Sequence, residues 1–251
     1  MSLPTINVPK FTLKLPISGI AVKARPFLIR EQKMLLQAME IGDKDQVTLA
    51  LDEIMKDCTF GEINVDELSV PDVEYLMLHI RSKSVGDSIK MNYTCKNELH
   101  EPQSDDLDHM ETCNTTIAIS ININDIKIKE FDDHDDKILL DGGLGIQLQD
   151  IPYGVYKNLF DKERNVINIM KLRNSCIKSV FDENKVWTRE EFNDADLNAF
   201  IENLYSTDYE KIEQYIKTMP VLEHTLDITC PNPKCGYKET ITLKGLDDFL
   251  V

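Results

Sequence analysis

The chain has 251 residues, with 44 acidic and 28 basic side chains and a formal net charge of −16. A surface with this negative excess repels the phosphates of nucleic acids and of anionic membranes, so neither is an expected partner. A hydrophobic fraction of 42 % is typical of a globular chain, and no apolar stretch is long enough to cross a bilayer. Because the N-terminus also lacks the pattern of a secretory signal, we expect the six cysteines to be reduced thiols or metal ligands in a cytoplasm.

The chain begins with a predicted β-hairpin followed by two helices. Alternating apolar residues over 11–24, interrupted by a Ser-Gly turn, indicate the hairpin. Residues 26–40 and 44–58 have the apolar spacing of helices, and the glycine at position 42 ends the first of them. The second helix carries Cys58 on its apolar face, so this thiol is predicted to lie in the core.

A third helix leads into the first pair of cysteine-bearing strands. Ser69 is predicted to cap this helix, with Asp72 as its partner in a capping box. An alternating strand then runs into Cys95, and a second one starts at Cys113. The polar residues 96–112 lie between them in place of a tight turn.

The second half again begins with a predicted hairpin, over residues 138–148. Residues 163–177 have the apolar spacing of a helix, with Cys176 near its end. Thr188 and Glu191 have the spacing of a second capping box and predict another helix start. Asp194 is predicted to cap a further short helix, with Leu197, Phe200, Ile201 and Leu204 on it.

The stretch DITCPNPKCGYKETI, residues 227–241, combines two β-rich runs with two closely spaced cysteines. The two prolines between Cys230 and Cys235 fix φ and remove backbone donors, so the link turns rather than extending a strand. Gly236 provides the conformational freedom that lets backbone N–H groups point toward a sulfur. This order of strand, cysteine, turn, cysteine, glycine and strand has the form of one half of a zinc ribbon.

A tetrahedral thiolate site needs four ligands, and the two hairpins together provide them. The predicted ligands of one structural Zn²⁺ are Cys95, Cys113, Cys230 and Cys235. The alternative is four unconnected thiols that only fill space. His100 and His109, in the polar insertion, are either substitute ligands or residues of an exposed loop.

These elements predict an α+β fold in which helical segments alternate with β-hairpins. The predicted domains are an N-terminal half, residues 1–130, and a C-terminal half, residues 131–251, each ending in a cysteine hairpin. Because the order of parts is similar in both halves, a two-fold internal pseudo-repeat is one hypothesis, and a chance recurrence of α+β parts is the other.

The sequence contains no constellation typical of an enzyme. The five histidines are scattered, and no GxSxG, HExxH, Walker or dinucleotide-binding pattern is present. Four thiolate ligands would also leave zinc without an open position for water, which makes the metal structural. We therefore expect no catalytic activity.

Four stretches taken together resemble a known family: KARPFLIREQKMLLQAME, MKDCTFGEINVDELSVPDVEYLML, RSKSVGDSI and CPNPKCGYKETITLKGLDDFL. Their order is similar to that in the T4-type bacteriophage baseplate protein family, which includes the baseplate hub subunit and the hub assembly catalyst. The resemblance covers residues 25–130 and 220–251, and is less clear between them. The chain departs from the pattern by its insertion between Cys95 and Cys113 and by the spacing of Cys230 and Cys235.

The resemblance implies a non-enzymatic virion protein of a contractile-tailed phage, a hub subunit or hub assembly factor acting in tail assembly. It implies partners among the baseplate hub and tail proteins, with the tape measure protein as a candidate, and it is compatible with an oligomer. It places the chain in the tail baseplate or, during assembly, in the host cytoplasm. The alternatives are a tail-assembly chaperone absent from the mature virion and a phage zinc-ribbon adaptor.

Apolar residues near both chain ends are candidate partner contacts. They are Phe11, Leu13 and Leu15 of the opening hairpin and the terminal pair Phe249-Leu250. The alternative is that both groups pack into the protein's own core.

Overall fold

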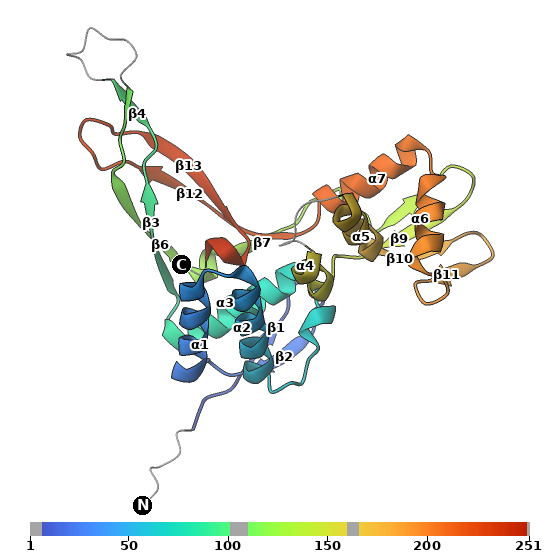
Figure 1. The fold of residues 1–251 in the computed structure, drawn as a ribbon, viewed down its shortest axis with the longest axis horizontal. Coiled ribbons are helices and arrows are strands. Elements are labelled where there is room, and N and C mark those ends of the chain that lie inside the picture. The colour runs from blue at the N-terminus through green and yellow to red at the C-terminus, as the bar shows by residue number, and fades with distance from the viewer. Residues whose placement is uncertain (1–6, 101–109, 160–165, 250–251) are drawn as a thin grey trace, which may run out of the picture.

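The computed structural model describes residues 7–100, 110–159 and 166–249. Over these residues it contains seven α-helices and several small antiparallel sheets, which confirms the predicted α+β class (Figure 1). Three apolar clusters form the core of the described chain. We call the corresponding parts the helical body, the ladder module and the distal lobe.

The helical body joins the opening hairpin to four helices. Its strands are β1 (Phe11–Lys14) and β2 (Ala21–Ala24), and its helices are α1 (Ile29–Ile41), α2 (Lys44–Cys58), α3 (Val70–Val85) and α4 (Tyr153–Leu159), with the 3-10 turn η1 (Val65–Glu67). Gly42 ends α1 with a φ of 73°, as predicted. Cys58 is completely buried in this core, also as predicted, and burial raises the pKa of its thiol to about 11.

The start of α3 differs in one respect from the predicted capping box. The hydroxyl of Ser69 does accept the backbone N–H of Asp72. The carboxylate of Asp72, however, accepts the backbone N–H groups of Ile17 and Ser18, both at 2.9 Å. This completely buried carboxylate therefore ties the turn of the opening hairpin to α3, a long-range partner that the local pattern could not reveal.

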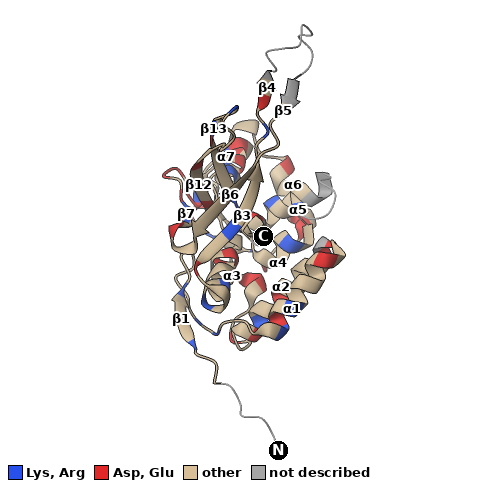
Figure 2. Cartoon of the chain, turned by 90° about the vertical axis from the view of Figure 1, so that its left-hand side faces the viewer, with Lys and Arg blue, Asp and Glu red and all other residues tan. Residues whose placement is uncertain are grey.

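The ladder module consists of two long antiparallel pairs that lie side by side (Figures 1 and 2). One pair is β3 (Ser88–Thr94) with β6 (Thr116–Asn122), and the other is β12 (Val221–Thr229) with β13 (Lys238–Lys244). The short strand β7 (Lys127–Lys129) adds to β12, after the 3-10 turn η2 (Ile123–Asp125). A further short pair, β4 (Glu98–His100) with β5 (Met110–Thr112), extends the first ladder.

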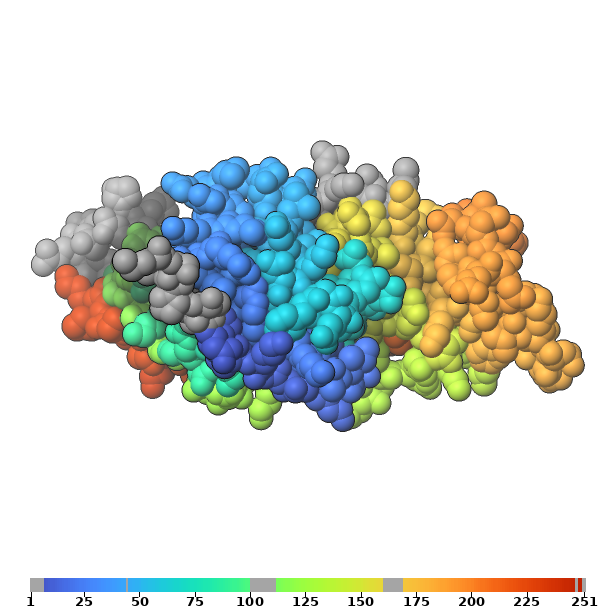
Figure 3. All heavy atoms as spheres, turned by 90° about the horizontal axis from the view of Figure 1, so that it is seen from below, coloured from blue at the N-terminus to red at the C-terminus, as the bar shows by residue number. Residues whose placement is uncertain are grey.

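The distal lobe forms one end of the elongated molecule (Figure 3). Its sheet has the order β11–β10–β9–β8, formed by β8 (Lys137–Leu139), β9 (Gly145–Leu148), β10 (Ile177–Phe181) and β11 (Val186–Thr188). Its helices are α5 (Val166–Cys176), α6 (Asp194–Glu202) and α7 (Ser206–Lys217). Cys176 is completely buried in this core, and burial raises the pKa of its thiol to about 12.

The helix predicted to start at Thr188 is wrong. The carboxylate of Glu191 accepts the backbone N–H of Thr188 at 2.8 Å, as in a capping box, but Thr188 ends strand β11 and the chain only turns there. The short helix predicted after it is present as α6, and its cap is Asn193 instead of Asp194, through the backbone N–H groups of Ala195 and Asp196. The same hydrogen-bond pattern thus closes a turn when the preceding residues are held in a sheet.

The predicted partner contacts near the chain ends are wrong for two of the residues. Leu15 and Phe249 are both fully buried, in the cores of the helical body and of the ladder module. Phe11 and Leu13 are partly buried against the first of these cores, and Leu250 lies outside the described residues. The terminal segment, with its 3-10 turn η3 (Leu246–Asp248), is therefore part of the fold.

Replacing Phe249 with alanine is expected to destabilise the protein by about 3–5 kcal/mol, because it leaves a large cavity between the ladders and α3. Urea unfolding followed by circular dichroism measures this loss. The control is Tyr237→Ala, which removes an aromatic side chain from the β12–β13 connection, where the residue is 43 % exposed. Equal, small losses in both variants would contradict the buried position of Phe249.

The two halves of the sequence do not form separate cores. The C-terminal pair β12–β13 packs on residues of the first half, and α4 contributes Tyr153 to the helical body. The division at residues 130 and 131 stays a prediction. The pseudo-repeat is not shown, since β10 and β11 have no counterpart among the described strands of the first half.

Candidate metal centre

Each of the two long ladders ends at a pair of cysteines. Cys95 follows β3 directly, and Cys113 lies three residues before β6. Cys230 follows β12, and Cys235 lies three residues before β13. The register pairs Thr94 with Thr116 and Thr229 with Lys238, so the strands place both members of each pair at the same end of their ladder.

The C-terminal pair is held by a tight turn. The backbone carbonyl of Asn232 accepts the N–H groups of Cys235 at 2.9 Å and of Gly236 at 3.0 Å, and its side-chain oxygen accepts the N–H of Lys234. Gly236 has a φ of 58°, which a glycine adopts without steric cost. The predicted conformational freedom is therefore used, and the N–H of Gly236 donates to the carbonyl of Asn232.

The first pair reaches the same geometry in spite of the insertion. The N–H of Cys95 donates to the carbonyl of Thr115, and the N–H of Cys113 donates to the carbonyl of Asn97. Asn114, with a φ of 50°, turns the chain between these bonds. Since the described ends of the insertion pair with each other as β4 and β5, its length does not separate the two sulfurs.

The structure brings the four predicted cysteines together from both ladders. The Sγ atoms of Cys95 and Cys235 are 3.9 Å apart, those of Cys113 and Cys230 are 3.7 Å apart, and all four lie within 4.8 Å of one another. A disulfide would need about 2.05 Å. Tetrahedral thiolate ligands at about 2.3 Å from zinc lie roughly 3.8 Å apart. The four sulfurs therefore fit a metal ion that would join the two ladders.

The electrostatics of the cluster favour a bound cation. The hydroxyl of Thr115 lowers the pKa of Cys113, burial opposes this, and the backbone of Thr115 and the amide of Asn232 lower it further, to about 6. The backbone of Asn97 lowers the pKa of Cys95, but burial and the three neighbouring sulfurs raise it more, to about 12. Four thiols this close cannot all ionise unless a positive charge compensates them.

Polar side chains that the sequence analysis missed surround the sulfurs. The amide of Asn232 donates to the Sγ of Cys113 at 3.3 Å, and the amide of Asn97 lies 3.5 Å from the Sγ of Cys235. Both asparagines stand two residues after a cysteine, which is the one sequence signal that could have indicated them. His109 and the side chain of His100 lie outside the described part of the structure.

Replacing Asn232 with alanine is expected to weaken metal binding by about 10–100-fold, the usual effect of removing a group that orients a ligand. The change removes the donor to Cys113 and the side-chain acceptor of the turn. Competition with a chromogenic chelator measures the affinity. Asn92→Ala, at an exposed position of β3, is the matched control, and an equal affinity of the two variants would contradict this role.

The fold and the cluster define an α+β protein with a four-cysteine site that could bind a metal, held between two β-ladders. A protein-family model described as T4 bacteriophage base plate protein matches residues 8–251. Because this match spans nearly the whole sequence, the chain belongs to that family. No curated protein and no solved structure matches it. Among the described residues, none of the helices combines the length and apolar character of a membrane span.

Proposed function

We propose that the chain is a structural subunit of the baseplate hub of a contractile-tailed bacteriophage and acts through protein–protein contacts. The observation that carries this proposal is the match to the baseplate family over residues 8–251. The elongated shape, with a ladder module and a distal lobe at opposite ends, is suited to contacting more than one neighbour (Figure 3). Hub and tail proteins, including the tape measure protein, are the proposed partners, and the tail baseplate is the proposed location.

We also propose that the four cysteines bind one Zn²⁺, which has a structural role. Both close sulfur pairs connect one ladder to the other. A bound ion would therefore stabilise the packing of the two ladders, which are too narrow to bury a large apolar core. Four protein ligands leave no position for a reacting water, which supports a non-enzymatic function. The ladders also share an apolar cluster and side-chain hydrogen bonds, among them those from Tyr93 to Glu239 and from Asn232 to Thr115.

Mass spectrometry of purified tails tests the hub proposal. A subunit is expected at a fixed copy number relative to other baseplate proteins, and this ratio should persist after washing in high salt. Absence from purified tails, together with abundance in the infected lysate, would instead favour the assembly chaperone. Co-purification with an RNA polymerase and absence from tails would favour the zinc-ribbon adaptor.

A further inference from the structure

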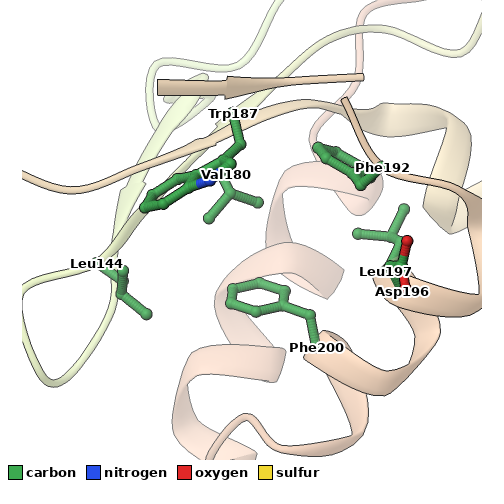
Figure 4. Close-up of a pocket in the computed structure, with 7 residues that line it drawn as sticks. All are labelled: Leu144, Val180, Trp187, Phe192, Asp196, Leu197 and Phe200. Carbon is green, nitrogen blue, oxygen red and sulfur yellow. The ribbon is translucent and has the colours of Figure 1, made fainter. Parts of the chain in front are cut away.

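The distal lobe has an apolar cavity of about 300 Å³ that opens to the surface (Figure 4). Its walls come from the sheet and from α6 with the loop before it: Leu144, Val180, Trp187, Phe192, Leu197 and Phe200. Asp196 is the one charged residue of the lining. The volume is at the lower end of the range of ligand pockets, which suits one bulky side chain better than a large cofactor.

Two aromatic side chains of this cavity each lie next to a cation. The Nζ of Lys185 lies 5.1 Å from the centre of the Trp187 ring, and the guanidinium of Arg189 lies 5.3 Å from that of Phe192. The same two cations form ion pairs, Lys185 with Glu191 and Arg189 with Asp194. Lys185 and Arg189 therefore already have partners within the lobe, an ion pair and a cation–π contact each.

The segment that supplies most of the cavity's lining is acidic. Residues 181–203 contain seven acidic and two basic side chains, an excess of five acidic groups. Since both basic groups of this segment are paired, its excess charge is negative, and the exposed Asp196 places one carboxylate in the lining itself. A second copy of this chain, with its net charge of −16, would be repelled by this acidic segment.

We propose that this cavity binds a bulky apolar side chain on a basic segment of another protein. A buried apolar anchor with complementary charges around it is the usual arrangement of an interface hot spot. β11 is the edge strand of the sheet next to the cavity, so an extended segment can approach along it. The inference rests on the proposed function in one respect, that the partner is a protein. Its test uses the purified protein and needs no phage particles.

Trp187, the one tryptophan of the chain, lines the cavity and reports on its occupation. The full-length protein is titrated with three peptides, acetyl-KKLFKK-amide, acetyl-EELFEE-amide and acetyl-KKAAKK-amide, while tryptophan fluorescence is recorded. The first peptide is expected to give a saturable change with an affinity about tenfold or more above the other two. The acidic peptide loses the charge attraction, and the alanine peptide loses the large apolar side chain that the cavity buries. Added salt should weaken this binding.

Two matched variants locate the binding. Leu144→Phe places a ring in the cavity and is expected to abolish the response, whereas Leu139→Phe, at a position that is 71 % exposed on β8, should leave it unchanged. Equal responses to all three peptides, no response, or a response that survives Leu144→Phe would overturn the proposal.

Self-association that Leu144→Phe removes would also overturn it, since the occupant would then be a second copy. Presence of the chain in purified tails is a separate result, so each proposal can fail alone.

Discussion

Replacing Cys230 with alanine is expected to abolish metal binding and to unfold the ladder module. Its Sγ lies 3.7 Å from that of Cys113, and the residue belongs to the cluster that joins the two ladders. The binding free energy of a structural zinc is folding free energy, about 10–16 kcal/mol in zinc-finger peptides. This is as large as the entire stability of a typical domain, about 5–15 kcal/mol, so the remaining contacts should not hold the ladders together.

The measurement combines metal analysis with limited proteolysis of the variant. New cleavage is expected in β12 and β13, together with loss of near-ultraviolet circular dichroism. Cys58→Ala is the matched control, because it removes a fully buried sulfur from the helical body, away from the cluster. It should retain the metal and lose about 1–2 kcal/mol. A Cys230→Ala protein that is as resistant to protease as this control would refute the role of the metal.

Replacing Glu31 with glutamine is expected to destabilise the protein by about 3–5 kcal/mol at neutral pH, since it leaves the buried guanidinium of Arg25 without a counter-charge. The side chains of Arg25 and Glu31 are 9 % and 1 % exposed, and their ion pair measures 2.9 Å. Glu31 also accepts the N–H of Leu28 at 2.6 Å, which fixes the start of α1. The pair therefore connects the end of the opening hairpin to the first helix.

The same carboxylate should contribute to the acid limb of the stability curve. Burial raises the pKa of Glu31, but hydrogen bonds from Arg25, Arg30 and Leu28 outweigh it and lower the pKa from 4.5 to about 2. A carboxylate with a lowered pKa contributes stability above its unfolded pKa and loses it as the pH falls. About 3 kcal/mol should therefore disappear between pH 4.5 and pH 2.

Urea unfolding at a series of pH values checks this contribution. In Glu31→Gln the loss of stability over that interval should be smaller than in the unchanged protein by about 3 kcal/mol. Glu40→Gln, at an exposed position of the same helix, serves as the control and should reproduce the original curve. Parallel curves for the two variants would show that Glu31 is not the titrating group.

Local patterns were sufficient to predict most elements of the described fold. The helix predicted over residues 44–58 matches α2, and the alternating runs next to Cys95 and Cys230 are strands as expected. These features depend on neighbours three or four positions away in a helix and on alternation in a strand, which a single sequence displays. The meeting of the four sulfurs was predictable for a further reason, because one tetrahedral site needs four ligands.

The features that sequence reasoning missed depend on partners distant in the chain. Asp72 bonds to a hairpin turn more than 50 residues away, and Phe249 is buried because two ladders and a helix close over it. Likewise, the strand pairing of β11 decides that Thr188 is not a helix start. The spacing of apolar residues within one element does not predict these contacts, because they form only when separate elements pack against each other.

The most direct test of the account is the metal content of the protein, purified under reducing conditions and equilibrated with a zinc buffer. If Cys95, Cys113, Cys230 and Cys235 close around one ion, elemental analysis will find about one zinc per chain. A chain that remains folded and contains no metal at equilibrium would contradict the proposal that an ion joins the two ladders.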